Sequence, residues 1–200
     1  MPAAVREALS VSRETASRLE AYVACLLRWQ RTINLVAPST LAAVWTRHVL
    51  DSGQLWRSWP EGARVHVDLG SGGGLPGLVL AIMGATGTHL VESDRRKAAF
   101  LREAARAAGA TVTVHAARIE EAPALVADVI TARALAPLPE LLRLGRRFAG
   151  PATVWLLPKG RGAAEELTAA RAIGTMQADL LPSLTDPEGR IVRLREVALG

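Results

Sequence analysis

The architecture of this chain is set by residues 64–82, which read Arg64-Val-His-Val-Asp-Leu-Gly-Ser-Gly-Gly-Gly-Leu-Pro-Gly-Leu-Val-Leu-Ala-Ile82. Residues 65–68 are a β-rich run that ends on a carboxylate, residues 70–77 are a glycine-rich loop, and residues 78–82 begin an apolar helix. A strand, a glycine loop and a helix in this order build a binding corner for an anion or a nucleotide. The glycines allow the backbone to approach a ligand closely, and the helix N-terminus offers N–H groups without partners.

The loop does not match a nucleoside-triphosphate site. A phosphate-cradling loop needs Lys and then Ser or Thr directly after its last glycine. Gly72 and Gly77 have the required spacing, but Leu78 and Val79 follow them.

The loop also departs from a dinucleotide fingerprint, which requires G-x-G-x-x-G. Counting from Gly70 and Gly72, the third glycine falls on Leu75. The pattern present is Asp-x-Gly-x-Gly-x-Gly, which begins at Asp68. A carboxylate at this place repels a pyrophosphate and suits a ligand that carries an ammonium and a sulfonium. The pattern resembles the first motif of S-adenosylmethionine-dependent methyltransferases, with a glycine-rich turn of another α/β protein as the alternative.

Length and composition predict one soluble domain. The chain has 200 residues, half of them hydrophobic, which suits a single domain, residues 1–200, with a full core. It has no run of 18 apolar residues and no signal-peptide layout, so we expect no membrane span and no export. A lone cysteine, Cys25, cannot form an internal disulfide, and we expect a cytoplasmic protein.

The formal net charge of +5 favours an anionic partner, and nucleic acid is the commonest one. The alternative is an arginine-rich composition without a function, because the only lysines are Lys97 and Lys159.

The order of predicted elements indicates an α/β fold with a helical N-terminal cap. Ser12 caps an amphipathic helix that we expect to run to about Ile33, and a second helix covers residues 40–50, so that residues 1–60 form the cap and residues 61–200 the core. Seven strands are predicted, with helices between most of them: residues 65–68, 88–92, 111–115, 128–132, 153–157, 176–181 and 190–197. This alternation predicts a mostly parallel sheet covered on both faces.

Candidate ligand-binding residues follow the predicted strands, because parallel sheets bind ligands at the carboxyl ends of their strands. Asp68 and Gly70 follow the first strand, Glu92 the second, Ile119 and Glu120 the third, and Arg133 the fourth. Glu92 lies where an acidic residue meets ribose hydroxyls, of an adenosyl group or of NAD alike. Glu120 and Arg133 also fit a surface ion pair.

Several separated stretches together resemble the glucose-inhibited division protein B family, the ribosomal small-subunit RNA methyltransferases G. They are Ile33-Asn-Leu35, Arg47-His48-x-x-Asp51-Ser52, Asp68-x-Gly-Ser-Gly-x-Gly-Leu-Pro-Gly77, Glu92-Ser93-x-x-x-Lys97-x-x-Phe100-Leu101, Arg118-Ile-Glu120 and Thr131-Ala-Arg-Ala134. They cover about residues 15–160. The chain departs from the family at Gln30-Arg31, where a Trp-Asn pair is usual, at Val36, and in its loosely matching C-terminal strands.

This resemblance implies a Rossmann-like class I fold and transfer of a methyl group from S-adenosyl-L-methionine to N7 of one guanine in the decoding-region stem-loop of 16S rRNA. It implies cofactor contacts at Gly70, Leu75, Ile119, Glu120 and Arg133, with the backbone of Ile119 facing the adenine. Position and motif add three more residues to the expected cofactor site: Asp68, Gly72 and Glu92.

The predicted chemistry agrees with the residues that are missing. Guanine N7 presents an in-plane lone pair and needs no proton removed, so no general base is required, and Arg133 is a candidate for positioning only. Cys25 lies far along the chain from the loop, which argues against pyrimidine C5 methylation. No His, Cys and carboxylate cluster has metal-ligand spacing, and His66, His89 and His115 lie within strands.

The expected partner is small-subunit rRNA or the 30S subunit, bound by a monomer without a metal. Candidate RNA contacts flank the expected sheet edge: Arg47, His48, Arg133, Lys159 and Arg161. A second basic set also fits a solvated helix face: Arg95, Arg96, Arg102, Arg106, Arg143, Arg146 and Arg147. Three other functions remain open at this point: a methyltransferase acting on a small molecule or protein, a non-catalytic nucleotide-binding or ribosome-assembly module, and a nicotinamide oxidoreductase.

Overall fold

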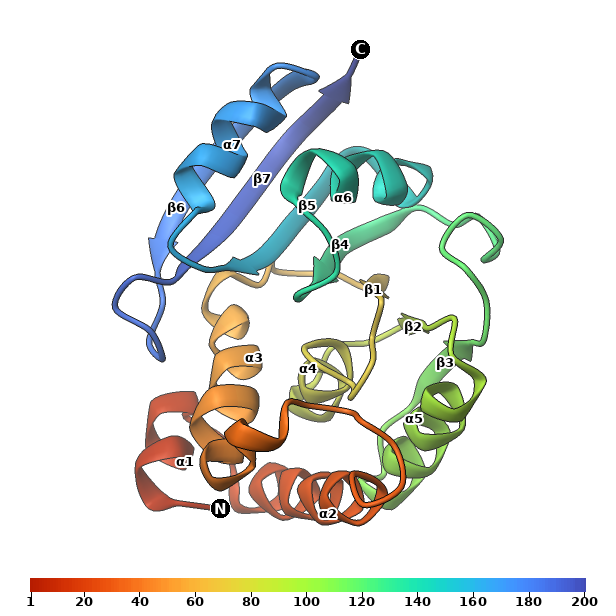
Figure 1. Cartoon of the computed structure of the whole chain (residues 1–200), viewed down its shortest axis with the longest axis vertical. Helices are drawn as coiled ribbons and strands as arrows, with labels where there is room; N and C mark the ends of the chain where they lie inside the picture. Colours follow the sequence, from red (N-terminus) through yellow and green to blue (C-terminus); the bar gives the residue numbers. More distant parts are fainter.

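The computed structural model describes residues 1–200 and contains one seven-stranded sheet in the order β3-β2-β1-β4-β5-β7-β6 (Figure 1). The strands are β1 (His66–Leu69), β2 (Thr88–Val91), β3 (Val112–His115), β4 (Ala127–Ala132), β5 (Ala149–Lys159), β6 (Gly174–Pro182) and β7 (Arg190–Leu199). Only β7 runs against its neighbours, β5 and β6. The predicted mostly parallel, seven-stranded α/β sheet is confirmed.

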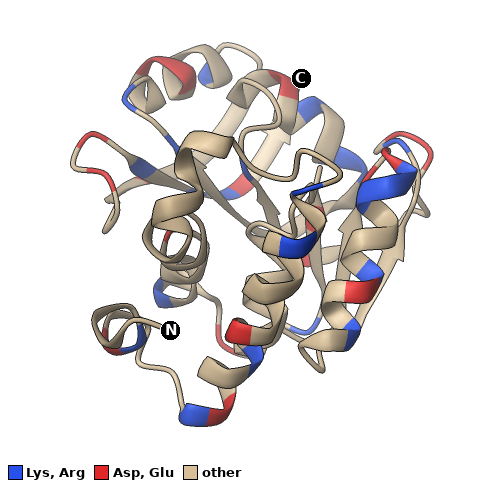
Figure 2. Ribbon diagram, turned by 60° about the horizontal axis from the view of Figure 1, so that its bottom comes forward, with Lys and Arg blue, Asp and Glu red and all other residues tan.

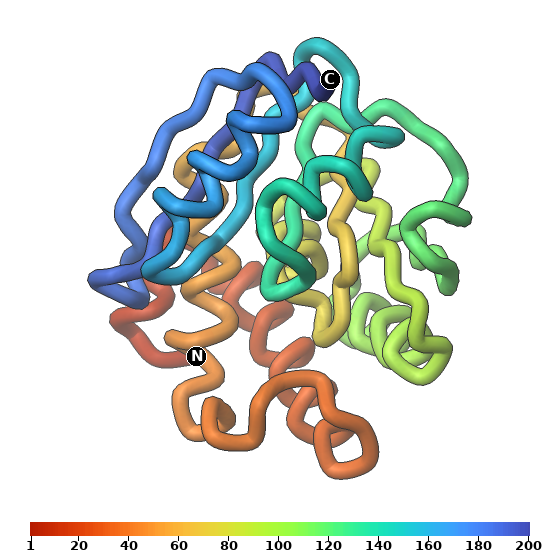
Figure 3. The backbone as a smooth tube through the Cα atoms, turned by 45° about the horizontal axis from the view of Figure 1, so that its top comes forward, coloured from red at the N-terminus to blue at the C-terminus, as the bar shows by residue number.

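Helices cover both faces of the sheet, as the alternating pattern predicted. They are α4 (Gly77–Met83), α5 (Arg95–Ala107), α6 (Leu138–Gly145), η4 (Arg146–Phe148) and α7 (Ala163–Arg171). The apolar residues of α4 and α5 share a cluster with the N-terminal helices, whereas those of α6 and α7 share a cluster with β5 and β7. Figure 3 shows α6 and α7 next to each other, and Figure 1 shows them at the opposite end of the molecule from α1 and α2. None of the helices has both the length and the apolar character that crossing a bilayer requires.

The N-terminal cap consists of more helices than expected. The structure adds α1 (Ala3–Leu9), which was not predicted, before α2 (Arg13–Trp29). Ser12 caps α2 as predicted, because its hydroxyl accepts from the Thr15 N–H at 3.0 Å. The helix ends at Trp29 rather than near Ile33. The Gln30 side chain that follows bonds instead to the N–H groups of Leu35 and Val36, at 2.9 and 3.0 Å, which turns the chain away.

The predicted second helix of the cap is helical, but it is not an α-helix over residues 40–50. A 3₁₀ segment, η1 (Pro38–Ala43), leads into a π-helical turn, η2 (Trp45–Leu50). A short α3 (Asp51–Gly53) and a second 3₁₀ segment, η3 (Gln54–Ser58), extend it beyond the predicted end. π-Helical turns are rare and are often found at functional sites, where the wider turn re-aims side chains.

Cap and sheet are joined by shared packing rather than by a linker. Leu19, Tyr22 and Leu26 of α2 lie in the same buried cluster as Leu78 of α4 and Phe100 of α5. Trp29 also packs edge-on against Phe100, with the ring centroids 6.0 Å apart. These contacts pack the cap against the α/β core, and the single domain of residues 1–200 stays a prediction.

The strand register brings the predicted site residues to one edge of the sheet. Leu69, the last residue of β1, pairs with Ala132 of β4 and with Val91 of β2. Gly70, Glu92 and Arg133 therefore leave neighbouring strands at the same level. This edge is where open parallel sheets bind their ligands.

Candidate active site

A cavity of about 800 Å³ opens at the carboxyl ends of β1, β4 and β5. The glycine loop, the residues after β4, the N-terminal cap and the loop between β6 and β7 enclose it. Its lining includes the glycines of the loop and the polar or charged side chains of Arg47, His48, Asp51, Gln54, Lys97, Arg133, Lys159, Glu166, Asp186 and Arg190. The volume is within the range of about 300–1,000 Å³ that is typical of small-molecule sites.

The glycine loop forms the floor of this cavity with bare backbone. Gly70 and Gly72 have φ angles of +66° and +50°, a conformation that residues with a Cβ rarely adopt. A Cβ atom on Gly70 would lie 2.7 Å from Cδ1 of Leu135, which lines the opposite wall. Glycine at position 70 therefore keeps the wall open, which is the role that the sequence predicted for this loop.

Tyr22, the only tyrosine of the chain, anchors the glycine loop through a hydrogen bond. Its hydroxyl donates to the carbonyl oxygen of Gly73 at 2.6 Å, and both groups are buried. Burial raises the pKa of Tyr22 far above its ordinary value, so the phenol keeps its proton and remains a donor.

We expect Tyr22→Phe to lower the free energy of unfolding by about 1–3 kcal/mol, because the buried Gly73 carbonyl loses its donor. Urea unfolding measures this change, and calorimetry with S-adenosylmethionine measures the accompanying loss of affinity. Thr168→Ala is the matched control, because its hydroxyl bonds only to a carbonyl on the exposed side of α7. Unchanged stability in Tyr22→Phe would contradict the role of the Tyr22 hydroxyl in holding the glycine loop.

Glu92 closes the loop from the side of β2. Its Oε2 accepts from the Gly72 N–H and its Oε1 from the Asp94 N–H, each at 2.8 Å. The side chain is buried and does not line the cavity. Glu92 thus lies at the predicted strand end and is bonded to the loop in this structure, and its contact with a ribose remains a prediction.

Asp68 lies beneath the glycine loop and is fully buried. Its Oδ1 accepts from the Thr131 hydroxyl at 2.6 Å, while its Oδ2 has no hydrogen-bond partner. Burial raises the pKa of Asp68 from 3.8 to about 6, and the hydrogen bond from Thr131 opposes this increase. The carboxylate does not line the cavity, so any effect on a bound ligand passes through the loop.

The raised pKa of Asp68 makes a testable contribution to stability. The folded protein binds this proton more tightly than the unfolded chain, so the free energy of unfolding falls as the pH rises through about 6. The total fall from this group is about 3 kcal/mol. We expect Asp68→Asn to remove this fall, so that the variant gains stability over the wild type between about pH 4 and pH 7. Urea unfolding across this range measures the difference, and a flat difference curve would contradict the prediction.

Arg133 binds the cap to the end of β4. Its Nη1 donates to Asp51 Oδ2 at 3.1 Å and to the carbonyl oxygen of Arg47 at 3.2 Å. The sequence left a surface ion pair between Glu120 and Arg133 as an alternative. The structure corrects this, because Arg133 pairs with the largely buried Asp51 and Glu120 is exposed with no ion-pair partner.

His48 is part of a directed chain of hydrogen bonds. Arg133 Nη2 can only donate, so His48 Nδ1 accepts from it at 3.1 Å and the proton of the ring resides on Nε2. Nε2 then donates to the Thr40 hydroxyl at 2.7 Å, and this hydroxyl donates to the Ala37 carbonyl at 2.7 Å. Burial and, after it, the nearby Arg133 charge lower the pKa of His48 to about 4, so the ring is neutral at physiological pH.

Ile119 and Glu120 lie beside the site, outside the cavity wall. Ile119 is buried, and its carbonyl oxygen accepts from Arg147 Nη1 at 3.2 Å. Glu120 is exposed. The structure therefore places both after β3, as predicted, and their contact with the adenosyl group remains a prediction.

The candidate RNA contacts differ in position. Arg47, His48 and Lys159 line the cavity, and Lys159 is paired with Glu166 at 2.8 Å. Arg161 lies outside it, in an exposed ion pair with Glu188 at 3.5 Å. Figure 2 shows Lys and Arg distributed over several helices and strands rather than concentrated on one.

Sequence reasoning missed several residues of the cavity wall. Gln54 reaches the cavity from η3, Asp186 from the loop between β6 and β7, and Arg190 from the start of β7. No local pattern marks them, because they meet the glycine loop only through the tertiary fold. The described chain contains no cluster of three or more His, Cys, Asp or Glu side chains that could hold a metal ion.

Comparison with known proteins identifies the family. The family model described as rRNA small subunit methyltransferase G matches residues 15–187. The chain is 59% identical over 191 residues to the ribosomal RNA small subunit methyltransferase G of Rhodospirillum centenum, covering 96% of this chain and 88% of that one. It is 54% identical over 190 residues to the protein of the same name from Paramagnetospirillum magneticum, covering 95% and 93%.

Solved structures of low sequence identity share the fold. A ribosomal protein L11 methylase from Lactobacillus delbrueckii subsp. bulgaricus matches with a TM-score of 0.61 and 12% identity, over 75% of this chain and 78% of that one. An O-methyltransferase from Bacillus cereus matches with a TM-score of 0.56 and 14% identity, over 92% and 91%. These structures show the fold alone, and the sequence matches show the family. The chain belongs to the rRNA small subunit methyltransferase G family.

Proposed function

We propose that this chain methylates N7 of one guanine in the decoding-region stem-loop of small-subunit rRNA and that the cavity above the glycine loop holds both reactants. The chain is, as a member of its family, an S-adenosylmethionine-dependent rRNA guanine-N7 methyltransferase. The observation that supports the proposed site is the cavity of about 800 Å³ at the sheet edge where Gly70 and Arg133 emerge side by side.

The residues present fit S-adenosyl-L-methionine. Bare backbone at Gly70 and Gly72 lines the cavity where a side chain would fill it. The wall carries charged groups of both signs, which suits a ligand with an ammonium, a sulfonium and a carboxylate. From the resemblance and from their places after β1, β2, β3 and β4, we propose the cofactor-binding set Asp68, Gly70, Gly72, Leu75, Glu92, Ile119, Glu120 and Arg133.

When bound, the cofactor supplies an electrophilic methyl group. The chain has to bring guanine N7 in line with it, because N7 already carries a free lone pair and no proton has to leave first. Positioning of this kind accounts for about 7–11 kcal/mol of a barrier. Arg133 and Asp51 hold each other in place, and His48 Nδ1 is engaged by Arg133, so these side chains are suited to orienting rather than to proton transfer.

Charge around the cavity suits an RNA. Arg47, Lys97 and Arg190 line it and have no carboxylate partner, so they are available for phosphates. We propose that the chain acts in the cytoplasm, where small subunits are assembled, and as a monomer. A monomeric state is supported by the small number of large apolar side chains that are exposed, because a stable interface usually needs a larger apolar patch. They are Leu27, Val126, Leu135, Leu180 and Leu184.

Transfer of labelled methyl from S-adenosylmethionine tests the proposal. The acceptors are unmethylated small subunits and the naked rRNA extracted from them, and the labelled nucleoside is identified after digestion. We expect label in N7-methylguanine at one position, and the more active acceptor identifies the form of the substrate. Label in another nucleoside, or none in either acceptor despite cofactor binding, would refute the proposal.

A further inference from the structure

Three carboxylates line the cavity, and two of them are neutralised by ion pairs. Asp51 is paired with Arg133 at 3.1 Å, and Glu166 with Lys159 at 2.8 Å. The Asp186 carboxylate has no cationic partner, and the only hydrogen bond that it makes is the one that its Oδ1 accepts from the Glu188 N–H at 3.0 Å. A single unneutralised carboxylate in the binding site of a polyanion repels phosphate, so its presence calls for another explanation.

The loop that carries Asp186 is fixed to the cap. The Leu184 N–H donates to Gln54 Oε1 at 2.7 Å, and the Thr185 hydroxyl donates to Asp51 Oδ1 at 2.6 Å. Asp51 is also the partner of Arg133. The partly buried Asp51 carboxylate therefore holds both the β6–β7 loop and the residue that follows β4, which sets the place of Asp186 relative to the glycine loop.

The residues that line the cavity come from two parts of the sheet, its centre and its β6–β7 edge, and these define a glycine half and a hairpin half. Gly70, Gly72 and Leu75 line the half that follows β1. Ser183 and Asp186 of the β6–β7 loop and Arg190 at the start of β7 line the half at that edge. If the cofactor lies over the glycine loop, the half that contains Asp186 remains for the methyl acceptor.

Guanine chemistry matches this carboxylate. The N1–H and N2 amino groups are adjacent donors on the Watson–Crick edge, and the two oxygens of a carboxylate accept from both. Adenine presents an acceptor at N1 and cannot make the same pair. N7 is on the other side of the base, so a guanine held at Asp186 directs N7 away from the loop and toward the glycine half.

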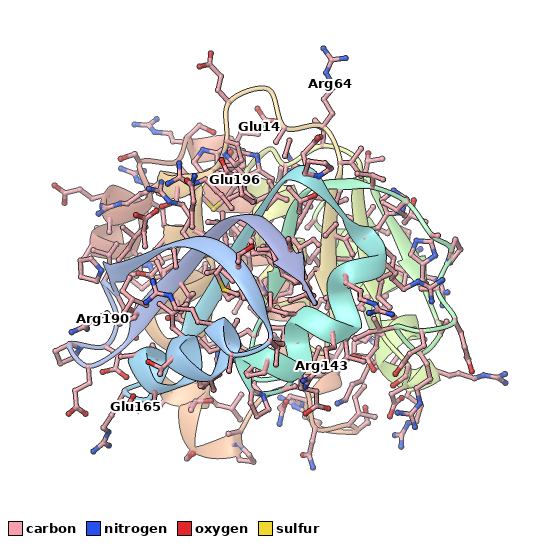
Figure 4. All side chains as sticks on the ribbon, turned by 90° about the horizontal axis from the view of Figure 1, so that it is seen from above. Glu14, Arg64, Arg143, Glu165, Arg190 and Glu196 are labelled. Atoms are coloured by element: carbon pink, nitrogen blue, oxygen red, sulfur yellow. The ribbon has the colours of Figure 1, made fainter.

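We propose that Asp186 accepts hydrogen bonds from N1–H and the N2 amino group of the target guanine and is thereby a specificity-determining residue of the reaction. This inference rests on the proposed function. Arg190, the first residue of β7, donates through Nη1 to the carbonyl oxygens of Pro187 and Gly189 in that loop, at 3.0 and 2.7 Å. Figure 4 shows Arg190 at the rim of the molecule, where the rest of its guanidinium can meet the backbone phosphate of the same nucleotide.

The test compares Asp186→Asn with the wild type on two acceptors. The first is small-subunit RNA with guanine at the mapped target position, and the second carries inosine there, which lacks only the N2 amino group. Asparagine keeps an oxygen for the Glu188 N–H, so the turn is preserved. Glu165→Gln is the matched control, because this exposed carboxylate on α7 has no bonding partner and lies outside the cavity (Figure 4).

We expect the wild type and Glu165→Gln to methylate the inosine acceptor about 10- to 100-fold less efficiently, in kcat/KM, than the guanine acceptor. Asp186→Asn should lose a similar factor on guanine and treat guanine and inosine alike, with unchanged affinity for S-adenosylmethionine. A merely structural role for Asp186 lowers activity on both acceptors and leaves their ratio unchanged.

Two results would overturn the inference while the proposed function stands. The first is a ratio of kcat/KM on guanine to kcat/KM on inosine that is the same in Asp186→Asn as in the wild type. The second is a weakened affinity for S-adenosylmethionine with that ratio retained, which would assign Asp186 to the cofactor. Absence of N7-methylguanine from the wild-type reaction would instead refute the proposed function and the inference with it.

Discussion

Replacing Gly70 with aspartate is expected to lower methyl transfer by at least about 100-fold, the loss that a displacement of about 1 Å in a reacting centre produces. The new Cβ atom would lie 2.7 Å from Cδ1 of Leu135, and its carboxylate would enter the space above the loop. The φ angle of +66° adds about 1–2 kcal/mol of strain to any residue with a Cβ. Calorimetry should detect no cofactor binding, while the circular dichroism spectrum stays that of a folded protein.

Gly62→Asp is the control that separates the effect of filling the cavity from the effect of straining the backbone. Gly62 also has a positive φ angle, +75°, but no atom lies within 4 Å of the Cβ position. We expect this variant to carry a similar strain and to transfer methyl groups like the wild type. Wild-type transfer by Gly70→Asp, or equal losses in both variants, would contradict the role assigned to position 70.

Removing the Arg133 guanidinium is the second change with a large expected effect. Arg133→Met leaves Asp51 without its cation and His48 Nδ1 without a donor, and these groups are largely buried. The free energy of unfolding should fall by about 1.5–3 kcal/mol, the typical contribution of a hydrogen bond to a charged group. Because Arg133 also lines the cavity, kcat/KM should fall by about 100-fold.

Arg133→Lys tests whether charge alone is sufficient. One ammonium cannot reproduce the planar fork that reaches Asp51, His48 and the Arg47 carbonyl together, so we expect only partial recovery. In Arg133→Met the pKa of His48 should rise, because the nearby positive charge that lowers it is gone. NMR titration of the His48 ring measures this, with Arg171→Met, an exposed arginine of α7, as the control. Full activity in Arg133→Met would refute the proposed role.

The parts of the fold that local patterns encode were predictable from the sequence. Glycine and apolar periodicity placed all seven strands, and α5 begins at a local cap, where Asp94 Oδ1 accepts from the Arg96 and Lys97 N–H groups. The first strand and the glycine loop also lie where residues 65–77 predicted. Such features depend on residues that are close together in the chain, so a single sequence is sufficient to predict them.

The contacts that finish the site depend on distant partners and were not predictable. The ion pair between Asp51 and Arg133 joins residues 82 positions apart, and the bond from Thr185 to Asp51 spans 134. No periodicity reports which carboxylate an arginine meets, so the Glu120 alternative could not be excluded. The π-helical turn η2 escaped prediction for the same reason, because its His48 and the Arg47 carbonyl meet Arg133 across the cavity.

The strand order β5-β7-β6 has a consequence for the order in which the chain folds during synthesis. β6 leaves the ribosome before β7, yet β7 is its only partner in the sheet and must insert between it and β5. Until then the exposed edge of β5 offers unpaired backbone groups to other chains. The loop that joins β6 and β7 therefore reaches its place only after β7 has been made, and the wall of the cavity that carries Asp186 is complete only then.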